Sequence, residues 1–295
     1  MTSTLSIVIP THLPLERTSG LINSCLSQLN PNDEVVVVVD QPDYAPQYTS
    51  LPGIKAVVNE ENLGAAASRN RGIAAASNGI ILFLDSDGTI PSDLLESHRC
   101  EHAEGPPKVV AGKTTMLSND TWYAEHLLKH GTFIDAYALA GRNKLTNDIY
   151  FAPTANISAP RFICEEFPFE EDFPKKGGGE DLFFCLSVRR KYKIREGAAT
   201  IEQSIWDGFW KGLVLRLVRW GSSQPLVAAK CERDGLTEYL CLPPTVPGIP
   251  SEPHKKLPLF PLFLVRANQF GMVLGGIKIK RTDLIRAPFN IIGKG

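Results

Sequence analysis

Residues 80–88 read IILFLDSDG, an apolar run that breaks off into two aspartates one residue apart. The apolar part, 80–84, predicts a buried strand because it is short, continuous and bounded by turn residues. The preceding stretch GAAASRNRGIAAASNG (64–79) predicts a helix with a small-residue face that stops at Asn78-Gly79. A helix that leads directly into a buried strand is the repeating unit of a parallel α/β sheet.

Three further strands are predicted on the N-terminal side of this unit, namely LSIVIP (5–10), EVVVVVD (34–40) and IKAVVNE (54–60). The second is β-branched throughout, which is typical of a central parallel strand covered on both faces. We therefore expect an α/β protein with a doubly wound, mostly parallel sheet. Such sheets bind ligands beyond the carboxyl ends of their strands, where Pro10, Thr11, Asp40 and the two aspartates are expected to lie.

Composition excludes several classes of protein. Of the 295 residues, 43% are hydrophobic and 21% charged, as in ordinary globular proteins. The formal net charge of −1 gives no bulk attraction to a polyanion, so nucleic acid is not an expected partner. The six cysteines include no C-x-x-C pair, which predicts free thiols in a reducing compartment rather than a disulfide framework or a zinc site.

The chain shows no segment that predicts export or membrane insertion. MTSTLSIVIPTH (1–12) has no basic region ahead of its short apolar run, so no signal peptide is expected. The longest apolar stretches, VVVVV (35–39) and LPLFPLFLV (257–265), are far shorter than the ~20 residues that span a bilayer. We expect a cytoplasmic protein, with peripheral contact at the inner face of the membrane left open.

Two enzyme classes carry an aspartate pair of this kind. Asp85-Ser86-Asp87-Gly88-Thr89 matches the D-x-D-G-T of haloacid-dehalogenase-like phosphatases letter for letter, and D-x-D is also the metal-binding signature of GT-A glycosyltransferases. The phosphatases place this motif on their first strand and need a later acidic pair after a buried strand. Here three strands precede it, and the later pair, Glu180-Asp181, follows FPKKGGG (173–179), which does not predict a buried strand.

Further motifs decide between the two classes. In chain order they are SIVIPTH (6–12), EVVVVVD (34–40), NLGAAASRNRGI (62–73), the D-x-D strand, ANISAPR (155–161) and GGGEDLFF (177–184). This series resembles glycosyltransferase family 2 in order and spacing from residue 4 to residue 200, and N-L-G-x-x-x-x-R-N-R-G-I is its most specific part. The resemblance implies a GT-A fold, a nucleotide-sugar donor (a UDP-sugar is expected), Mn²⁺ or Mg²⁺, and inversion at the anomeric carbon.

The resemblance also assigns roles on the donor side. Pro10 and Thr11 match the first loop, whose backbone lines the pocket of the nucleotide base, and Asp40 matches the residue that hydrogen-bonds the base. A turn aspartate is the alternative for Asp40, and Gln41 stands where relatives often have a second acid, so the identity of the base stays open. Arg69 matches the helix arginine that approaches the nucleotide and the D-x-D strand.

The aspartate pair is assigned in the same way. Asp85 is expected to face the ribose or a metal-bound water, whereas Asp87 binds the metal directly; Ser86 between them and Gly64 are counted with the donor site. Independently of the resemblance, carboxylates are ligands that Mg²⁺ and Mn²⁺ accept together with phosphate oxygens. A polar turn that caps a strand is the alternative interpretation.

Glu180 and Asp181 open a predicted helix after a Gly-rich stretch, where the helix dipole favours ionised carboxylates. They match the family's E-D motif, whose second residue is usually the catalytic base, so the resemblance gives that role to Asp181 with Glu180 beside it. Helix capping is the alternative. One departure concerns Gln203, which stands where many relatives have a histidine that reaches the metal or phosphate. Metal dependence is therefore less certain here, and a GT-A-like protein that binds nucleotide sugar without transferring it is a third hypothesis.

The C-terminal third is less informative. Residues 204–220 predict an amphipathic helix with an apolar stripe that includes Trp206, Trp210 and Leu213. Such a helix either lies in a membrane interface or packs on the core and covers the acceptor site. We divide the chain into a nucleotide-sugar-binding half (1–103), an acceptor-binding half (104–200) and a helix, Pro-rich linker and tail (201–295). The acceptor is expected to be a glycan, a lipid-linked group or another hydroxyl.

Overall fold

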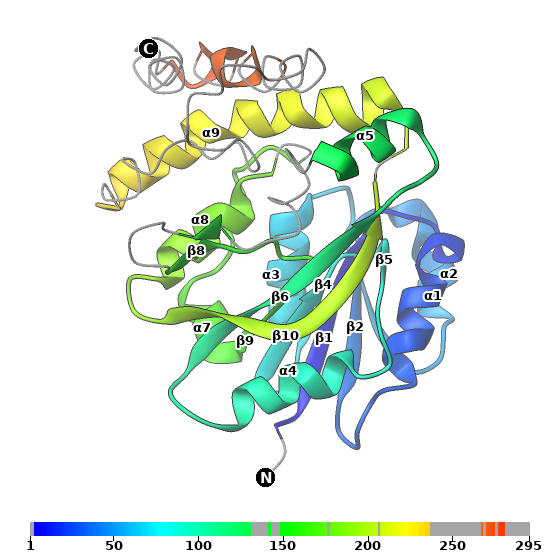
Figure 1. The fold of residues 1–295 in the computed structure, drawn as a ribbon. Helices are drawn as coiled ribbons and strands as arrows, with labels where there is room; N and C mark the ends of the chain where they lie inside the picture. The colour runs from blue at the N-terminus through cyan, green and yellow to red at the C-terminus, as the bar shows by residue number, and fades with distance from the viewer. Residues whose placement is uncertain are drawn as a thin grey trace.

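The computed structural model describes residues 3–130, 141–142, 148–175, 178–205, 207–236, 267, 270–274 and 277–280. Its centre is a twisted eight-stranded sheet with strand order β3-β2-β1-β4-β9-β6-β10-β5 (Figure 1). In chain order these strands are β1 (Leu5–Thr11), β2 (Glu34–Val39), β3 (Ile54–Val58), β4 (Ile80–Leu84), β5 (Gly88–Thr89), β6 (Lys108–Leu117), β9 (Asn156–Pro160) and β10 (Lys193–Ser204). Two short strands, β7 (Gly141–Arg142) and β8 (Ile149–Phe151), pair with each other outside this sheet.

The four strands predicted from the sequence form the parallel half of the sheet. β1 pairs in parallel with both β2 and β4, and β2 pairs in parallel with β3. β9 then lies antiparallel between β4 and β6, and β10 runs parallel to β6. The strand order reverses at β1, so the carboxyl ends of β1, β2 and β4 meet at one edge, where a doubly wound sheet binds its ligand.

Helices cover both faces of the sheet. α1 (Leu15–Leu26), α2 (Ala45–Thr49) and α4 (Leu94–Ala103) pack on one face, and α3 (Ala65–Ala75), α7 (Arg161–Glu166) and α8 (Glu180–Val188) pack on the other. A short 3-10 turn, η1 (Pro42–Tyr44), precedes α2. The run EVVVVVD serves both layers, because alternate strand residues point to opposite faces. Val36 and Val38 enter one core and Val35, Val37 and Val39 the other.

Helix α3 lies unusually close to the sheet, as the predicted small-residue face requires. A Cβ atom on Gly72 would come within 2.3 Å of Cγ1 of Val8. That distance is shorter than any normal carbon–carbon contact, so only glycine allows this approach of the helix to β1. The close packing brings Arg69, one turn earlier on α3, to the carboxyl end of the sheet.

The segment 204–220 differs from the single helix predicted for it. β10 continues to Ser204 because that strand end pairs with β6, with Gln203 opposite Met116. After Gly208, at a φ of 83°, a π-helical turn η2 (Phe209–Val214) leads into α9 (Leu215–Arg233), which contains Pro225. Trp206 lies outside the described residues, as does most of the Pro-rich segment and tail.

Helix α9 crosses over the edge of the sheet where the carboxyl ends of β1, β2 and β4 lie (yellow in Figure 1). Its N-terminal part and η2 bury Leu213, Val214 and Leu217 against α5 (Trp122–His130) and the end of β6. Its C-terminal part buries Val227 and Cys231 against α8. The apolar stripe therefore packs mostly inward. None of the described helices combines the length and the hydropathy that crossing a bilayer would need.

Candidate active site

A cavity of about 960 Å³ opens between the carboxyl edge of the sheet and helix α9. The residues that the family resemblance assigns to the donor site and to the catalytic base line it: Pro10, Thr11, Asp40, Gly64, Arg69, Asp85, Ser86, Asp87, Glu180 and Asp181. They come from the ends of three strands and from the N-terminal parts of α3 and α8. The candidate residues therefore lie together around one space, which we call the site cavity.

Asp40 organises one wall of the site cavity. Its Oδ1 accepts hydrogen bonds of 2.7 Å from Asn59 Nδ2 and from the Leu63 backbone N–H, and its Oδ2 accepts one of 2.9 Å from the Gly64 backbone N–H. The residue is 5% exposed. Gly64 has a φ of 91°, a conformation that favours glycine, and it starts α3. The carboxylate therefore fixes the loop that places α3, and one lone-pair position on Oδ2 is left for another donor.

Arg69 joins the two acidic clusters of the site. Its Nη1 donates to Glu180 Oε1 at 2.9 Å, and its Nη2 lies 3.3 Å from Asp85 Oδ1. The guanidinium carbon sits 5.5 Å from the centre of the Phe169 ring. Arg69 is 4% exposed, so these charges interact with little screening by water. The ion pairs link Arg69 on α3 to the end of β4 and to the start of α8, which lies 111 positions later in the sequence.

The aspartate pair stands at the turn after β4. The Asp85 backbone N–H bonds to the Ala155 carbonyl of the neighbouring strand, and Gly88 N–H closes the turn on the Asp85 carbonyl. Asp87 faces solvent inside the site cavity. Displacement of water by the surrounding protein raises the pKa of Asp87, the charge of Asp85 raises it further, and Arg216 opposes the rise. Two carboxylates are thus crowded together at the cavity floor.

Gln203 contacts this pair directly. Its Nε2 donates a 3.0 Å hydrogen bond to Asp87 Oδ1, because β10 pairs with β5 and sets Gln203 opposite Gly88. The glutamine at the position where the family resemblance leads one to expect a histidine therefore touches the carboxylate assigned to the metal. The strand β10, which runs across the boundary predicted at residue 200 between two parts of the chain, brings Gln203 there.

Glu180 and Asp181 begin α8 after Gly178 and Gly179, whose φ values of 74° and 104° require glycine. A Cβ on Gly178 would touch the Trp220 ring of α9. Glu180 is bound by Arg69, as described above. Burial raises the pKa of Asp181 to about 7; the charge of Glu180 also raises it, whereas Arg69 lowers it. A carboxyl group with such a pKa can take up a proton near neutral pH, which suits a general base.

The polar side of η2 and α9 supplies residues that sequence reasoning did not assign to the site. Lys211, Arg216, Arg219, Trp220 and Gln224 line the site cavity opposite the aspartates. In the sequence, the basic residues that recur beside the apolar stripe of residues 204–220 could have indicated this role. These side chains give the cavity a cationic roof over an acidic floor.

The donor atoms of the site bear on whether it can hold a divalent metal. Asp85 and Asp87 are accessible carboxylates at the cavity floor, and within the described ranges no group of three or more His, Cys, Asp or Glu side chains is arranged to hold a metal ion by itself. Mg²⁺ and related ions are commonly held by one or two carboxylates together with the phosphates of a substrate. The residues therefore fit an ion whose coordination a bound diphosphate completes.

Part of the chain is similar in sequence to known proteins. The putative glycosyltransferase EpsH of Bacillus subtilis (strain 168) is 36% identical over 88 residues, which cover 27% of this chain and 26% of that protein. The putative teichuronic acid biosynthesis glycosyltransferase TuaG of the same strain is 32% identical over 98 residues, covering 31% and 39%. The matched part of the chain thus spans well under half of either relative.

The fold is similar to solved structures over almost the whole chain. S. aureus TarS 1-349 in complex with UDP has a TM-score of 0.55 at 18% identity, covering 98% of this chain and 90% of that one. The mannosyltransferase PcManGT from Pyrobaculum calidifontis, in complex with GDP-Man and Mn²⁺, has a TM-score of 0.57 at 15% identity, covering 100% and 77%. The predicted GT-A fold is confirmed.

The family model described as Glycosyl transferase family 2 matches residues 6–170, more than half of the 295 residues. This match contains the first loop, Asp40, the arginine of α3 and the aspartate pair. It decides between the two enzyme classes that share the D-x-D spelling. The chain belongs to glycosyl transferase family 2.

Proposed function

We propose that the protein transfers a sugar from a nucleotide diphosphate sugar, with a UDP-sugar as the expected donor, to an acceptor hydroxyl with inversion at the anomeric carbon. The observation that carries the proposal is the convergence of all the donor-side and base candidates on one cavity, with Arg69 joining the two groups. Neighbours of the same fold hold UDP, UDP-GlcNAc or GDP-Man, which supports a nucleotide sugar as donor.

The donor is proposed to lie along the carboxyl ends of β1, β2 and β4. The base would occupy the pocket of Pro10, Thr11 and Asp40, where the remaining acceptor position of Asp40 Oδ2 can meet a base N–H. The diphosphate would then reach Asp85 and Asp87, with the cationic roof above it. Cations at that point compensate the charge that develops as the glycosidic bond breaks.

In the proposed transfer, the acceptor oxygen attacks the anomeric carbon, the bond from that carbon to the diphosphate oxygen breaks, and the diphosphate leaves with the electron pair. Asp181 takes the acceptor proton. Asp87, with Asp85, would hold Mn²⁺ or Mg²⁺, which as a Lewis acid would neutralise charge on the leaving diphosphate. By pairing with both carboxylates, Arg69 holds Glu180, and with it the start of α8, close to Asp85. With Asp181 on one side of the anomeric carbon and the diphosphate on the other, the proposed arrangement favours a single displacement with inversion.

The three parts of the chain take different roles in this proposal. Residues 1–103 bind the nucleotide sugar, residues 104–200 contribute the acceptor side, and residues 201–295 begin with the roof of the site cavity. The acceptor would enter beside Phe151 and Trp220, which line the same cavity as Asp181. Aromatic side chains beside polar groups suit a glycan or a glycan attached to a lipid, although any hydroxyl of fitting shape satisfies the chemistry.

Peripheral contact with the inner face of a membrane is a second part of the proposal. Although the apolar stripe packs mostly inward, Trp122 and Trp210 are 61% and 64% exposed. The Phe209 ring lies between them, with centroids 5.4 Å from Trp122 and 5.0 Å from Trp210. Exposed tryptophans with Lys211 beside them are typical of a surface that rests at the headgroup level.

The decisive experiment is a donor screen that follows release of UDP or GDP from a panel of nucleotide sugars, with Mn²⁺ and with a chelator. Release that depends on Asp181 supports transfer. Tight binding of a nucleoside diphosphate without any release would point to a sugar-binding protein that lacks transfer activity. Turnover of p-nitrophenyl phosphate, with no response to nucleotides, would instead revive the phosphatase hypothesis and contradict the proposal.

A further inference from the structure

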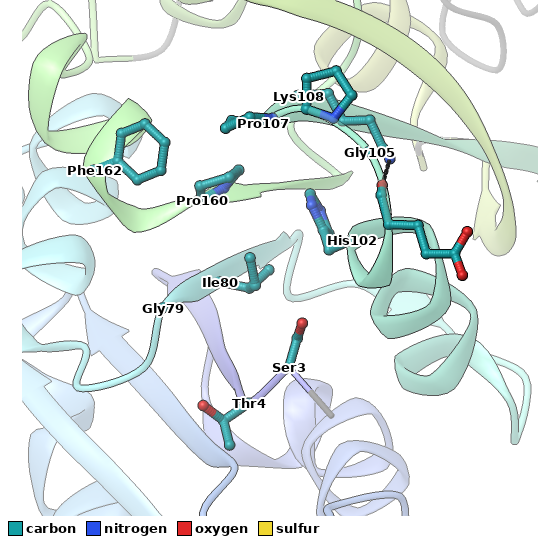
Figure 2. A pocket seen from close by; sticks show the side chains of 12 residues that line it. Ser3, Thr4, Gly79, Ile80, His102, Gly105, Pro107, Lys108, Pro160 and Phe162 are labelled. Carbon is teal, nitrogen blue, oxygen red and sulfur yellow. Dashed lines mark hydrogen bonds between the residues drawn. The ribbon is translucent and has the colours of Figure 1, made fainter. Parts of the chain in front are cut away.

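A second cavity, which we call the rear cavity, lies at the opposite edge of the sheet. It measures about 450 Å³, within the range of small-molecule pockets. Residues at the beginnings of β1, β4 and β6, the end of β9 and the loop after α4 enclose it (Figure 2). It shares no lining residue with the site cavity. Its chemistry must therefore be considered separately from transfer.

The walls of the rear cavity are mainly apolar and rigid. They are formed by Ile80, Pro106, Pro107, Pro160 and Phe162. Phe162 is 47% exposed, and Figure 2 shows its ring and the His102 ring on either side of Pro160. An aromatic face with a polar ring across from it resembles the general pattern of ligand pockets, in which a few placed polar groups orient a ligand on an apolar surface.

The protonation of His102 follows from a chain of hydrogen bonds that begins in the core. Asn156 Nδ2 contacts two backbone carbonyls, Lys113 O at 2.9 Å and Ala199 O at 3.2 Å. Carbonyl oxygens only accept, so this end of the amide must be the NH₂ group. The Asn156 oxygen is then the atom that faces His98 Nε2 at 2.8 Å, and His98 Nε2 must carry a proton.

The next links continue in one direction. Burial lowers the pKa of His98 to about 4, so its ring is neutral near pH 7 and Nδ1 is an acceptor. The Ser158 hydroxyl lies 2.8 Å from that nitrogen and must donate to it. The same oxygen lies 2.8 Å from His102 Nε2, from which it therefore accepts a hydrogen bond. Burial also lowers the pKa of His102 to about 4, and this leaves His102 Nδ1 with a bare lone pair.

That lone pair is open to a ligand. Across the described ranges, the buried side-chain nitrogens and oxygens without a partner are the Nε atoms of Arg69 and Arg99. His102 Nδ1 has no partner in the same ranges and is not one of these buried atoms, so it reaches solvent. The His102 ring lines the rear cavity. As long as the His102 ring is neutral, the cavity thus offers a hydrogen-bond acceptor, because the other neutral tautomer would break the chain of hydrogen bonds back to Asn156.

The charges at the rear cavity balance. Among the described residues that line it, Lys108 and Glu104 carry the charges, and Lys108 Nζ donates to the Glu104 carbonyl at 2.9 Å. A site with one ammonium, one carboxylate and a neutral imidazole gives no net attraction to a phosphate or to a cation. A neutral ligand with hydroxyl donors and an apolar face fits both the acceptor and the Phe162 ring. Saccharides combine these properties.

We propose that the rear cavity is a saccharide-binding site, in which the apolar face of a sugar ring stacks on Phe162 and a sugar hydroxyl donates to His102 Nδ1. It would hold a neutral sugar unit of a glycan on the far side of the sheet from the reaction. The site does not depend on transfer activity, because none of its residues belongs to the site cavity.

The test is NMR of the ¹⁵N-histidine-labelled full chain, titrated with methyl glycosides of neutral hexoses and N-acetylhexosamines while UDP fills the nucleotide site. We expect the His102 Nδ1 resonance to shift upfield on saturation, because a lone pair that accepts a hydrogen bond becomes more shielded. The His98 resonances should move much less. Titrations that leave His102 unmoved, even if the glycosides bind elsewhere, would overturn the proposal.

Two variants sharpen the result. Phe162→Ala should weaken glycoside binding at His102 about three- to tenfold, the loss expected for one aromatic stacking partner. Phe270→Ala is the matched control, since Phe270 is 58% exposed and lies outside the rear cavity. Equal affinities for Phe162→Ala and the unchanged protein would contradict the stacking. Because Phe162 is half exposed, its replacement should leave the fold intact, which the unchanged His98 resonances will report.

Discussion

The side-chain amide of Gln203 donates a 3.0 Å hydrogen bond to Oδ1 of Asp87. This contact joins the last strand of the sheet to the carboxylate that we assign to the metal, and it occupies one of the two oxygens that a metal ion would use. A histidine at this position would offer a nitrogen ligand instead. In the proposed metal site, Gln203 would therefore compete with an ion for one oxygen of Asp87 without acting as a strong ligand itself.

Replacing Gln203 should change metal affinity in a predictable direction. Gln203→His should tighten Mn²⁺ binding in the presence of UDP, because imidazole adds a ligand next to Asp87. Gln203→Ala should leave the number of protein ligands unchanged and alter affinity much less. Electron paramagnetic resonance of free Mn²⁺ measures both. Weaker Mn²⁺ binding by Gln203→His than by Gln203→Ala would argue against an ion at Asp87.

Asp87 and Asp40 should affect nucleotide binding in different ways. Asp87→Asn should remove the part of UDP affinity that depends on Mn²⁺. Asp40→Asn should weaken UDP binding with metal and with chelator alike. It should also lower the free energy of unfolding by about 1–3 kcal/mol, because a buried backbone N–H of the 59–64 loop loses its acceptor. Calorimetric titration measures the UDP affinities of both variants, and chemical denaturation measures the free energy of unfolding. Equal, metal-independent losses of affinity in the two variants would refute the division of roles.

The series of hydrogen bonds through His98, Ser158 and His102 predicts a pH dependence of the free energy of unfolding. The folded-state pKa of His98 is lowered from 6.5 to about 4, so the unfolded chain binds the proton more tightly. The contribution of His98 is therefore complete above pH 6.5 and is lost as the pH falls towards 4, by up to about 3 kcal/mol. Asp181, whose pKa is raised, changes stability in the opposite sense as the pH falls.

A variant separates the two effects. In His98→Gln, the free energy of unfolding should fall less between pH 6.5 and pH 4.5 than in the unchanged protein, because glutamine does not titrate. His12→Gln, at an exposed histidine, should keep the original slope. Denaturant titrations at four or five pH values give these slopes. Identical slopes for His98→Gln and the unchanged protein would show that protonation of His98 does not cause the pH dependence of stability.

The exposed tryptophans give a direct test of membrane contact. Trp122→Glu combined with Trp210→Glu should release the protein from anionic vesicles without lowering its melting temperature, because both side chains are largely exposed. Phe270→Glu, at another exposed aromatic, is the control for the added charge. Sedimentation with vesicles measures the bound fraction. If the unchanged protein fails to bind vesicles, residues 204–220 act only as the roof of the site cavity.

The position of the donor-side candidates at one edge of the sheet was predictable from sequence because its determinants are local. A run such as EVVVVVD fixes a strand, its direction and the position of Asp40 at its end, and parallel strands bring such ends to one edge. The roof was not predictable in the same way. Whether the stripe around Leu213 packs on α5 or on lipid depends on contacts with Met116 and Tyr123, which are distant in sequence. The extension of β10 to Gln203 likewise depends on pairing with β6.

The rear cavity had no sequence signal. His98 and His102 are four residues apart on α4, a spacing that fits a metal site, a surface helix or a core histidine equally well. Their chemistry is set by Ser158 and Asn156 on β9, to which only the folded sheet brings them. Long-range polar partners of this kind carry no periodicity that a sequence pattern can report.

Asp181 is predicted to be the general base, and its two charged neighbours allow a test by pH. Asp181→Asn should lower the transfer rate by ~10²–10⁴-fold, the contribution of a positioned general base, with little change in UDP affinity. In the unchanged protein the rate should rise with pH until Asp181 is ionised, with a midpoint near its pKa of about 7. Below that midpoint each pH unit should cost about tenfold in rate.

Charge changes at Glu180 and Arg69 should move this midpoint in opposite directions. Glu180 raises the pKa of Asp181 and Arg69 lowers it. Glu180→Gln should therefore shift the acidic limb of the pH–rate profile to lower pH, and Arg69→Gln should shift it to higher pH. Arg69→Lys keeps the charge and should shift the limb least, which separates electrostatics from a loss of packing around the buried guanidinium. Melting temperatures identify any variant that is too unstable to interpret. A limb that stays in place in both Glu180→Gln and Arg69→Gln would show that the titrating base is a different group, and Asp181 would lose its assignment.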